Sequence, residues 1–265
     1  MPLALGHALW RYRGLVLGSV KREFQSRYRN SLLGAAWTVF QPLAMITVYT
    51  VVFSQLMQAR LPGVNDPFAY SIYLCSGLLT WGLFAEIVQR CQTVFLDNGN
   101  MIKKLSFPRI CLPAIVVSSA LVNFAITFAV FLAFLLITGH FPSWVLLAII
   151  PLLLVHVMFA TGMGIAVGVL NVFFRDVGQF ISILLQFWFW FTPIVYSSTT
   201  LPAAVRPWIR LNPLTSFAQA YQGIFVNGLW PQWSSLWPSA VLAFILCILA
   251  LNLFRNRSAE MVDEL

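Results

Sequence analysis

Charged residues are scarce in this sequence. Asp, Glu, Lys and Arg make up only 9% of the residues, whereas 60% are hydrophobic. A soluble domain carries roughly 25% charged residues, so this chain has too few of them to cover a surface that faces water. Its 265 residues are therefore better interpreted as a series of membrane spans than as one or two soluble domains. The composition predicts an all-α integral membrane protein.

The motifs of several enzyme classes are also missing. No glycine precedes Lys21, Lys103 or Lys104, so the chain lacks the Gly-Lys-Ser/Thr sequence of a Walker A loop. It lacks a His-Glu-x-x-His metal helix, a Gly-x-Ser-x-Gly elbow and a carboxylate pair in an apolar segment. A hydrolase or a glycosyltransferase is therefore poorly supported. Ionisable groups within the spans are nearly absent, which argues against an ion-coupled transporter. The remaining interpretation is a membrane path whose energy source lies in another protein, with no cofactor or metal in this chain.

Cysteine pairs and nucleic-acid modules are absent as well. The four cysteines form no Cys-x-x-Cys pair and lie in or beside apolar segments, which predicts packing thiols at Cys75, Cys91, Cys111 and Cys247. The net charge is +8, yet no basic and aromatic nucleic-acid module is present. Of the 16 Lys and Arg residues, only Arg60, Arg206 and Arg210 fall in segments expected outside. This positive-inside bias predicts that both termini are cytoplasmic.

Apolar segments of membrane-spanning length recur along the chain. Six spans are predicted, at 33–57, 68–95, 112–137, 144–170, 177–196 and 239–254. The region between the last two is rich in proline and tryptophan, which predicts short re-entrant or interfacial helices on the outer side. We interpret residues 1–265 as one transmembrane domain. Its parts are 1–32 (interface helix), 33–95 (spans 1 and 2), 96–108 (cytoplasmic segment), 109–196 (spans 3 to 5), 197–237 (outer region) and 238–265 (span 6 and tail).

The residues before the first span form an amphipathic pattern. Leu17, Val20, Phe24 and Tyr28 recur at helical spacing on one face, and cations occupy the other. The pattern predicts a helix lying in the membrane interface. A simple cationic flank explains the charges equally well, and lipid-phosphate binding is the sharper hypothesis.

Three local patterns within the spans predict structural roles. Glu86 and Arg90 stand four residues apart on one helix face, so they are expected to form an ion pair. The small residues of the segment 161–168 predict close helix packing. His156 has no acidic partner in the sequence, so a structural role is favoured over a proton relay.

The cytoplasmic segment 96–108 is too polar to span and too short to form a domain. It has room for one short helix that ends before Pro108 and combines apolar side chains with two lysines. These features are expected of a short helix that binds another protein, and they are expected equally of an ordinary cytoplasmic loop.

Aromatic residues within or near the spans suggest what uses the path. They are Trp37, Phe40, Tyr73, Trp81, Phe84, Trp188 and Trp190. Rings flanked by amides stack on sugars and hold a passing polymer weakly at many sites, whereas the simpler interpretation is interface anchoring. Gln179, Ser182 and Gln186 share one face of the fifth span, which is expected to point at protein or at an aqueous path.

Five stretches of the chain together resemble one protein family. They are Arg27 to Trp37 with Pro42, Asn98 to Pro108, Phe174-Arg-Asp176, Phe191 to Tyr196, and Asn212-Pro-Leu214. In this order they resemble the membrane subunit of the ABC-2 class of polysaccharide exporters, which move O-antigen, capsule and teichoic acid polymers. The resemblance covers essentially the whole chain.

The resemblance implies an assembly in the bacterial inner membrane. Two copies of the chain would pair with two separate ATPase subunits that bind ATP and Mg. The segment containing Asn98, Met101, Lys103, Lys104 and Phe107 would be the coupling helix that docks on the ATPase. The N-terminal helix would be the interface helix, and the region after Tyr196 the outer gate.

The resemblance also implies a substrate, a polymer linked to undecaprenyl diphosphate. Arg27, Arg29 and Arg175 are the candidates to meet the diphosphate at a cytoplasmic entrance, and Trp37 and Phe40 to meet the first sugars. The alternatives are an ABC-2 permease for drugs or lipids, and a membrane-embedded enzyme or scaffold of polysaccharide synthesis.

Overall fold

The computed structural model of the protein describes residues 10–28, 33–58, 60–64, 66–104 and 108–264. The side chains of Arg27, Tyr28, Ala35 and Lys104 lie outside this description. All regular secondary structure in the described residues is helical. The elements are α2 (Arg13–Tyr28), η1 (Gly34–Ala36), α3 (Trp37–Tyr49), η2 (Thr50–Leu56), α4 (Ala69–Asp97), α5 (Gly99–Lys104), α6 (Cys111–Thr138), η3 (Ser143–Ala148), α7 (Ile149–Phe173), α8 (Asp176–Phe191), η4 (Ser198–Thr200), α9 (Arg206–Leu211), α10 (Pro213–Asn227), α11 (Trp233–Arg257) and α12 (Glu260–Glu264).

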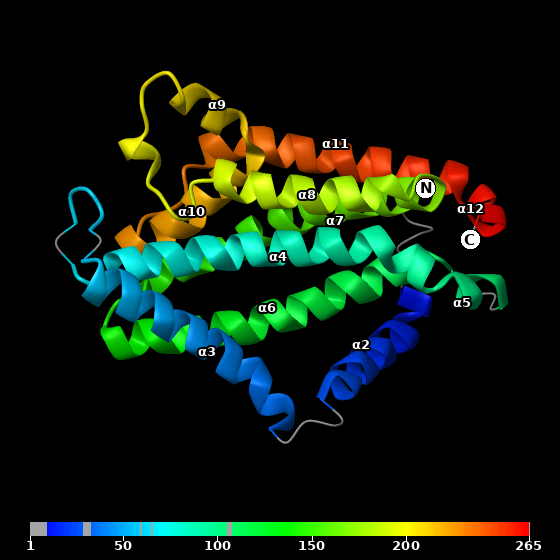
Figure 1. Ribbon diagram of the computed structural model, residues 1–265, viewed down its shortest axis with the longest axis horizontal. Coiled ribbons are helices and arrows are strands. Elements are labelled where there is room, and N and C mark those ends of the chain that lie inside the picture. Colours follow the sequence, from blue (N-terminus) through cyan, green and yellow to red (C-terminus); the bar gives the residue numbers. More distant parts are fainter. Residues whose placement is uncertain (1–9, 29–32, 59, 65, 105–107, 265) are drawn as a thin grey trace.

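The bundle is organised around α4. This helix contacts α6, α7, α8, α10 and α3, and in Figure 1 it lies between α8 and α6. In its most apolar stretch of 18 residues, 67% of the residues are buried, whereas the corresponding share in the other long apolar helices is 11% to 39%. Burial on several sides explains why α4 tolerates serine and threonine, which bond back to its own carbonyls, as Thr80 does to Ser76.

Glycines of α7 allow close packing against two neighbours. A Cβ on Gly168 would lie 2.4 Å from the Cys91 carbonyl oxygen of α4, and one on Gly162 would lie 2.8 Å from the Cys247 nitrogen of α11. Such backbone approach is available only to residues without a side chain. The prediction that the small residues serve helix packing is confirmed.

Within the described residues, five helical segments have the length and hydropathy to cross a membrane. They are Trp37–Leu56, Ala69–Asp97, Cys111–Thr138, Ser143–Phe173 and Trp233–Arg257. The predicted fifth span corresponds to α8, which has 16 residues and is only about 24 Å long at 1.5 Å per residue. The last span begins at Trp233 rather than 239, because α11 continues through Pro238.

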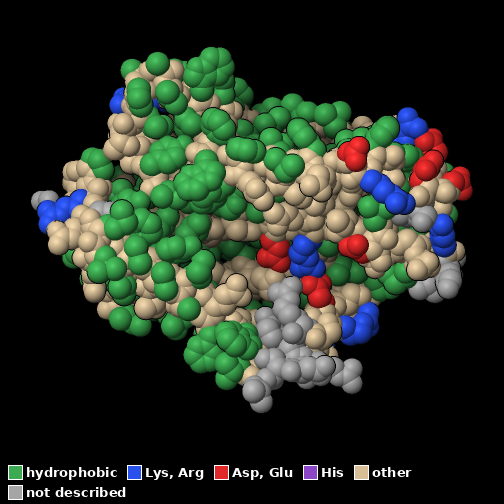
Figure 2. All heavy atoms as spheres, in the orientation of Figure 1, with side chains coloured by type: hydrophobic (Ala, Val, Ile, Leu, Met, Phe, Trp, Pro, Cys, Tyr) green, Lys and Arg blue, Asp and Glu red, His purple; other side chains and the backbone are tan. Residues whose placement is uncertain are grey.

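The two ends of the bundle differ in character. In Figure 1, α5 and α12 lie at one end, and the loops joined to α9 and α10 lie at the other. Figure 2 shows charged side chains gathering at the α5 and α12 end, while hydrophobic side chains cover much of the rest of this face. The region 197–237 contains η4, α9, α10 and the start of α11, and α10 packs against α4 and α11; the re-entrant path of these helices stays a prediction.

The N-terminal helix α2 packs against the bundle on one side only. It packs on α6, and its buried apolar residue is Val16. Leu17, which the pattern placed on the apolar face, is 66% exposed. Exposure of Leu17 in the single subunit does not contradict an apolar face directed at the membrane, so the interface helix stays a prediction.

Candidate functional site

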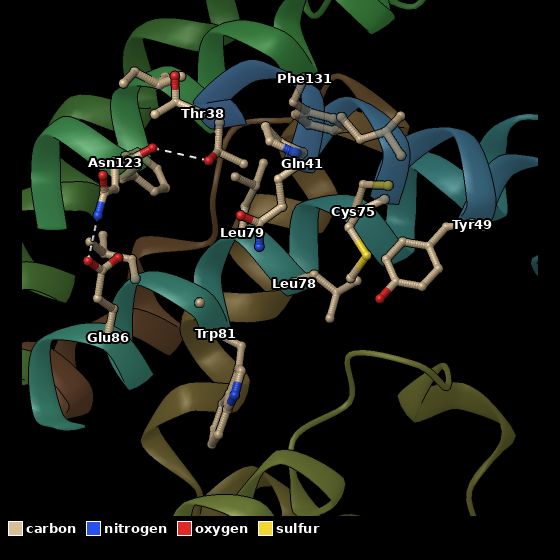
Figure 3. A pocket seen from close by; sticks show the side chains of 18 residues that line it. Thr38, Gln41, Tyr49, Cys75, Leu78, Leu79, Trp81, Glu86, Asn123 and Phe131 are labelled. Atoms are coloured by element: carbon tan, nitrogen blue, oxygen red, sulfur yellow. Dashed lines mark hydrogen bonds between the residues drawn. The ribbon is translucent and has the colours of Figure 1, made fainter. Parts of the chain in front are cut away.

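A cavity of about 510 Å³ lies between α3, α4 and α6. Thr38 and Gln41 of α3 approach it from one side, and Glu86 of α4 and Asn123 of α6 lie at one end (Figure 3). The opposite end is lined by apolar and aromatic side chains such as Phe131. The cavity thus has a polar end and an apolar end.

An ion-pair network closes the polar end. Arg90 Nη2 lies 2.7 Å from Glu23 Oε1 of α2, and Arg90 Nη1 lies 3.2 Å from Glu86 Oε1. Asn123 Nδ2 donates to the same Glu86 oxygen at 2.7 Å, and Ser119 Oγ donates to Glu23 Oε2 at 2.8 Å. The predicted Glu86–Arg90 pair is confirmed. The structure adds Glu23, so the network ties α2 to α4 and α6.

The predicted polar face of α8 divides into two parts. Gln179 and Gln186 are exposed, beside Phe187 and Trp190, which are 62% and 64% exposed. Ser182 instead points into the protein, where Gln92 Nε2 donates to its hydroxyl at 3.1 Å. A surface that alternates amides with large rings is therefore left uncovered along α8.

The predicted aromatics lie in two different environments. Trp37 and Phe40 are 48% and 50% exposed, on α3. Phe84 is buried in a stack with Phe159, with ring centroids 5.6 Å apart. The Tyr73 hydroxyl lies 2.9 Å from the Tyr196 carbonyl oxygen and is also inside the subunit.

Trp81 and Trp188 are intermediate between the exposed and the buried aromatics. Trp81 points toward α8 rather than toward Gln41 and Asn123, with its ring centroid 5.5 Å from that of Phe189 (Figure 3). Trp188 Nε1 donates to Asn212 Oδ1 at 2.8 Å. Both are partly buried, so among the seven predicted aromatics the rings most exposed in this single subunit are those of Trp37, Phe40 and Trp190.

The predicted cations and coupling residues are only partly described. Arg175 is exposed at the start of α8, and Lys103 is exposed on α5. Asn98 Nδ2 donates to the Val94 carbonyl oxygen at 2.8 Å, and Met101 is partly buried. Arg29, Phe107 and the side chains of Arg27 and Lys104 lie outside the described residues.

The corner between α7 and α8 depends on a residue that the sequence interpretation missed. Asn171 Nδ2 donates to the Gln92 carbonyl oxygen at 2.7 Å, and Asn171 Oδ1 accepts from Gly178 N at 2.8 Å. Asn171 is only 3% exposed. An asparagine just before a polar turn was the available signal, but its partners lie on two other segments.

The substitution Asn171→Leu is expected to loosen this corner. It leaves the Gly178 N–H without its partner and removes the second donor to the Gln92 carbonyl of α4, and an unpaired buried N–H costs about 1–3 kcal/mol. The melting temperature of the solubilised protein checks this. Asn256→Leu, at an exposed position on α11, serves as the matched control and should change it little. Equal melting temperatures of the two variants would contradict the assignment.

The chain is similar in sequence to one family of membrane transporters. The profile of the ABC-2 type transporter family matches residues 15–226. The chain is 30% identical to the O-antigen export system permease protein RfbA of Myxococcus xanthus, over 99% of this chain and 100% of that protein. It is 31% identical to an RfbA protein of the same description from Klebsiella pneumoniae, over 97% and 96% of the two chains. The polysialic acid transport protein KpsM of Escherichia coli is 20% identical over 92% and 93%.

Proposed function

Because the chain belongs to the ABC-2 type transporter family, we propose that it is the channel-forming permease of an ATP-driven polysaccharide exporter. Family membership confirms the resemblance drawn from the motifs. The helical spans and the relatives support a multi-pass protein of the bacterial inner membrane. The observation that carries the proposal is the uncovered α8 face, which combines Gln179 and Gln186 with large rings in a chain that matches polysaccharide permeases over nearly its full length.

The α8 face suits a water-filled path better than lipid. An amide without a partner is costly against hydrocarbon, so Gln179 and Gln186 favour contact with water, polymer or protein. Exposed rings such as Trp190 offer stacking surfaces to sugars. One subunit supplies only one wall, so a second copy closes the conduit, with the weakly buried α3 as part of the contact.

The sixth crossing is assigned to α8. In Figure 1, α7 ends at the same end of the bundle as α5 and α12, and α11 begins at the opposite end. The chain between Phe173 and Trp233 must therefore return across the bundle, and α8 with the segment after Phe191 supplies that return. With six crossings both termini lie on the same side of the membrane, and the positive-inside bias makes that side cytoplasmic. We assign α2 to this side as the interface helix, and α9 and α10 to the outer gate.

An ABC exporter of this kind has ATPase subunits and a polymer substrate as its partners. Two ATPase subunits bind ATP and Mg and dock on α5, whose exposed Lys103 faces outward. The substrate is a polymer carried on undecaprenyl diphosphate, for which Arg175 at the start of α8 is the described cationic candidate. An exporter of small apolar compounds is the second candidate, favoured by the apolar end of the cavity between α3, α4 and α6.

The substitution Gly82→Trp tests the conduit where the cavity adjoins α8, because the neighbouring cavity residue Trp81 packs on Phe189 of that helix. Gly82 lines the cavity and is exposed, and a Cβ there meets nothing within 4 Å, so a side chain can start at this position without a backbone clash. Surface polysaccharide is expected to fall by at least about tenfold, because an added apolar constriction blocks passage. It is measured on whole cells, with the amount of co-purified ATPase as the check on assembly.

The matched control is Leu249→Trp on the exposed face of α11, which should leave export intact. Normal export by Gly82→Trp, or an equal loss in the control, would contradict the conduit. Loss of small-compound efflux with normal polysaccharide export would support the second candidate.

A further inference from the structure

The C-terminal helix α12 lies against the helix assigned to the ATPase. It contacts α5 and also the end of α7 (Figure 1). Both α12 and α5 are short, with five and six residues. Helices of this length do not persist alone in water, because nucleation is unfavourable. The position of each therefore depends on what it packs against.

Met261 is the residue that fixes α12. Its side chain is 0% exposed, although Glu260, Asp263 and Glu264 around it are exposed. Met261 is part of the main hydrophobic core of the subunit, which also includes Ile102 of α5, 6% exposed, and Phe254 of α11. Complete burial of one side chain in an otherwise polar tail indicates a docked segment rather than a trailing end.

A second contact joins the same two segments. Arg109, at the turn after α5, donates from its guanidinium to the Ser258 carbonyl oxygen, between α11 and α12. This contact is independent of Met261, since it uses a main-chain group on the tail and a side chain beyond α5. The segment that contains α5 is thus held to the tail at two places.

We propose that residues 258–264 are a brace that positions α5 for power transmission, with Met261 and Arg109 as its positioning residues. The proposal rests on the function assigned to α5 above. Movement of the ATPase pushes α5, and α5 is joined in sequence to α4 and α6 only. The brace joins it also to α7 and α11, so the push moves these spans as well. Without the brace, α5 yields locally and ATP is hydrolysed without moving polymer.

The substitution Met261→Ala in the complex with the ATPase tests the brace. Docking of the tail on α5 should weaken by at least about tenfold, because a buried methionine side chain is removed. Amide hydrogen exchange of residues 99–104 is expected to accelerate, while exchange within α4 stays unchanged. Polymer exported per ATP hydrolysed should fall several-fold, with the amount of bound ATPase preserved. The matched control is Asp263→Asn on the exposed side of α12.

Arg109 supplies a second variant that leaves the core intact. Arg109→Ala should lower the same ratio of export to hydrolysis, and Arg109→Lys, which keeps a donor, should restore part of it. A ratio equal to that of the unaltered complex in both Met261→Ala and Arg109→Ala would overturn the brace. So would unchanged exchange of residues 99–104 in Met261→Ala. Failure of the unaltered complex to move polysaccharide would overturn the proposed function instead.

Discussion

The substitution Gly168→Ala is expected to separate α7 from α4 and to remove most of the folded protein from the membrane. The added Cβ would lie 2.4 Å from the Cys91 carbonyl oxygen and 3.3 Å from a ring carbon of Phe95. The carbonyl belongs to the backbone of the central helix, so it cannot rotate away as a side chain would. Overpacking of this kind costs about 1–3 kcal/mol and occasionally more.

The measurement is the melting temperature and yield of the solubilised protein. Gly223→Ala in α10 is the matched control, because a Cβ there meets nothing within 4 Å and alanine favours a helix by about 1 kcal/mol over glycine. Gly164→Ala offers a further distinction, since its clash is with the Cys91 side chain at 2.8 Å. Cys91→Gly should relieve Gly164→Ala but not Gly168→Ala. A Gly168→Ala protein as stable as Gly223→Ala would contradict the close packing.

The parts of the fold that the sequence predicted are those that local periodicity controls. The Glu86–Arg90 pair is four residues apart on one helix, and the glycines of α7 recur at helical spacing, so both could be found without knowing any neighbour. The long apolar helices were found for the same reason. The shortness of α8 was not found, because residues 192–196, which follow its aromatic run, are apolar enough to continue a span but lie outside the helix.

The parts that could not be predicted depend on partners far along the chain. Phe84 and Trp190 are both aromatic residues within apolar segments, yet one is 0% and the other 64% exposed. Phe84 lies on the side of α4 that α7 covers, whereas Trp190 lies on the side of α8 that no other described helix of the subunit covers. Ser182 shared a helical face with two glutamines but bonds to Gln92, 90 residues away. Periodicity assigns a residue to a face of its helix but not to a neighbour.

Arg90→Met is expected to destabilise the network at the polar end of the cavity and to release α2 from α4. Arg90 lies between two carboxylates, and both lose this cation at once. The side chains are 27% to 30% exposed, between surface pairs, which contribute 0–1 kcal/mol, and buried pairs, whose breaking costs 3–5 kcal/mol. We therefore expect a loss of about 1–3 kcal/mol. Thermal unfolding of the solubilised protein measures it.

A triple variant that also removes the two carboxylate charges separates the loss of the cation from a simple loss of contacts. Combining Arg90→Met with Glu23→Gln and Glu86→Gln removes both carboxylate charges and keeps amides that can accept from Ser119 and Asn123. The triple variant is expected to be more stable than Arg90→Met alone, because the like charges left near each other have gone. Arg22→Met, on the exposed side of α2, is the control and should cost less than about 0.5 kcal/mol. If the triple variant proves less stable than Arg90→Met, the carboxylates gain their stability from other contacts, and Arg90 is not the residue that joins α2 to α4.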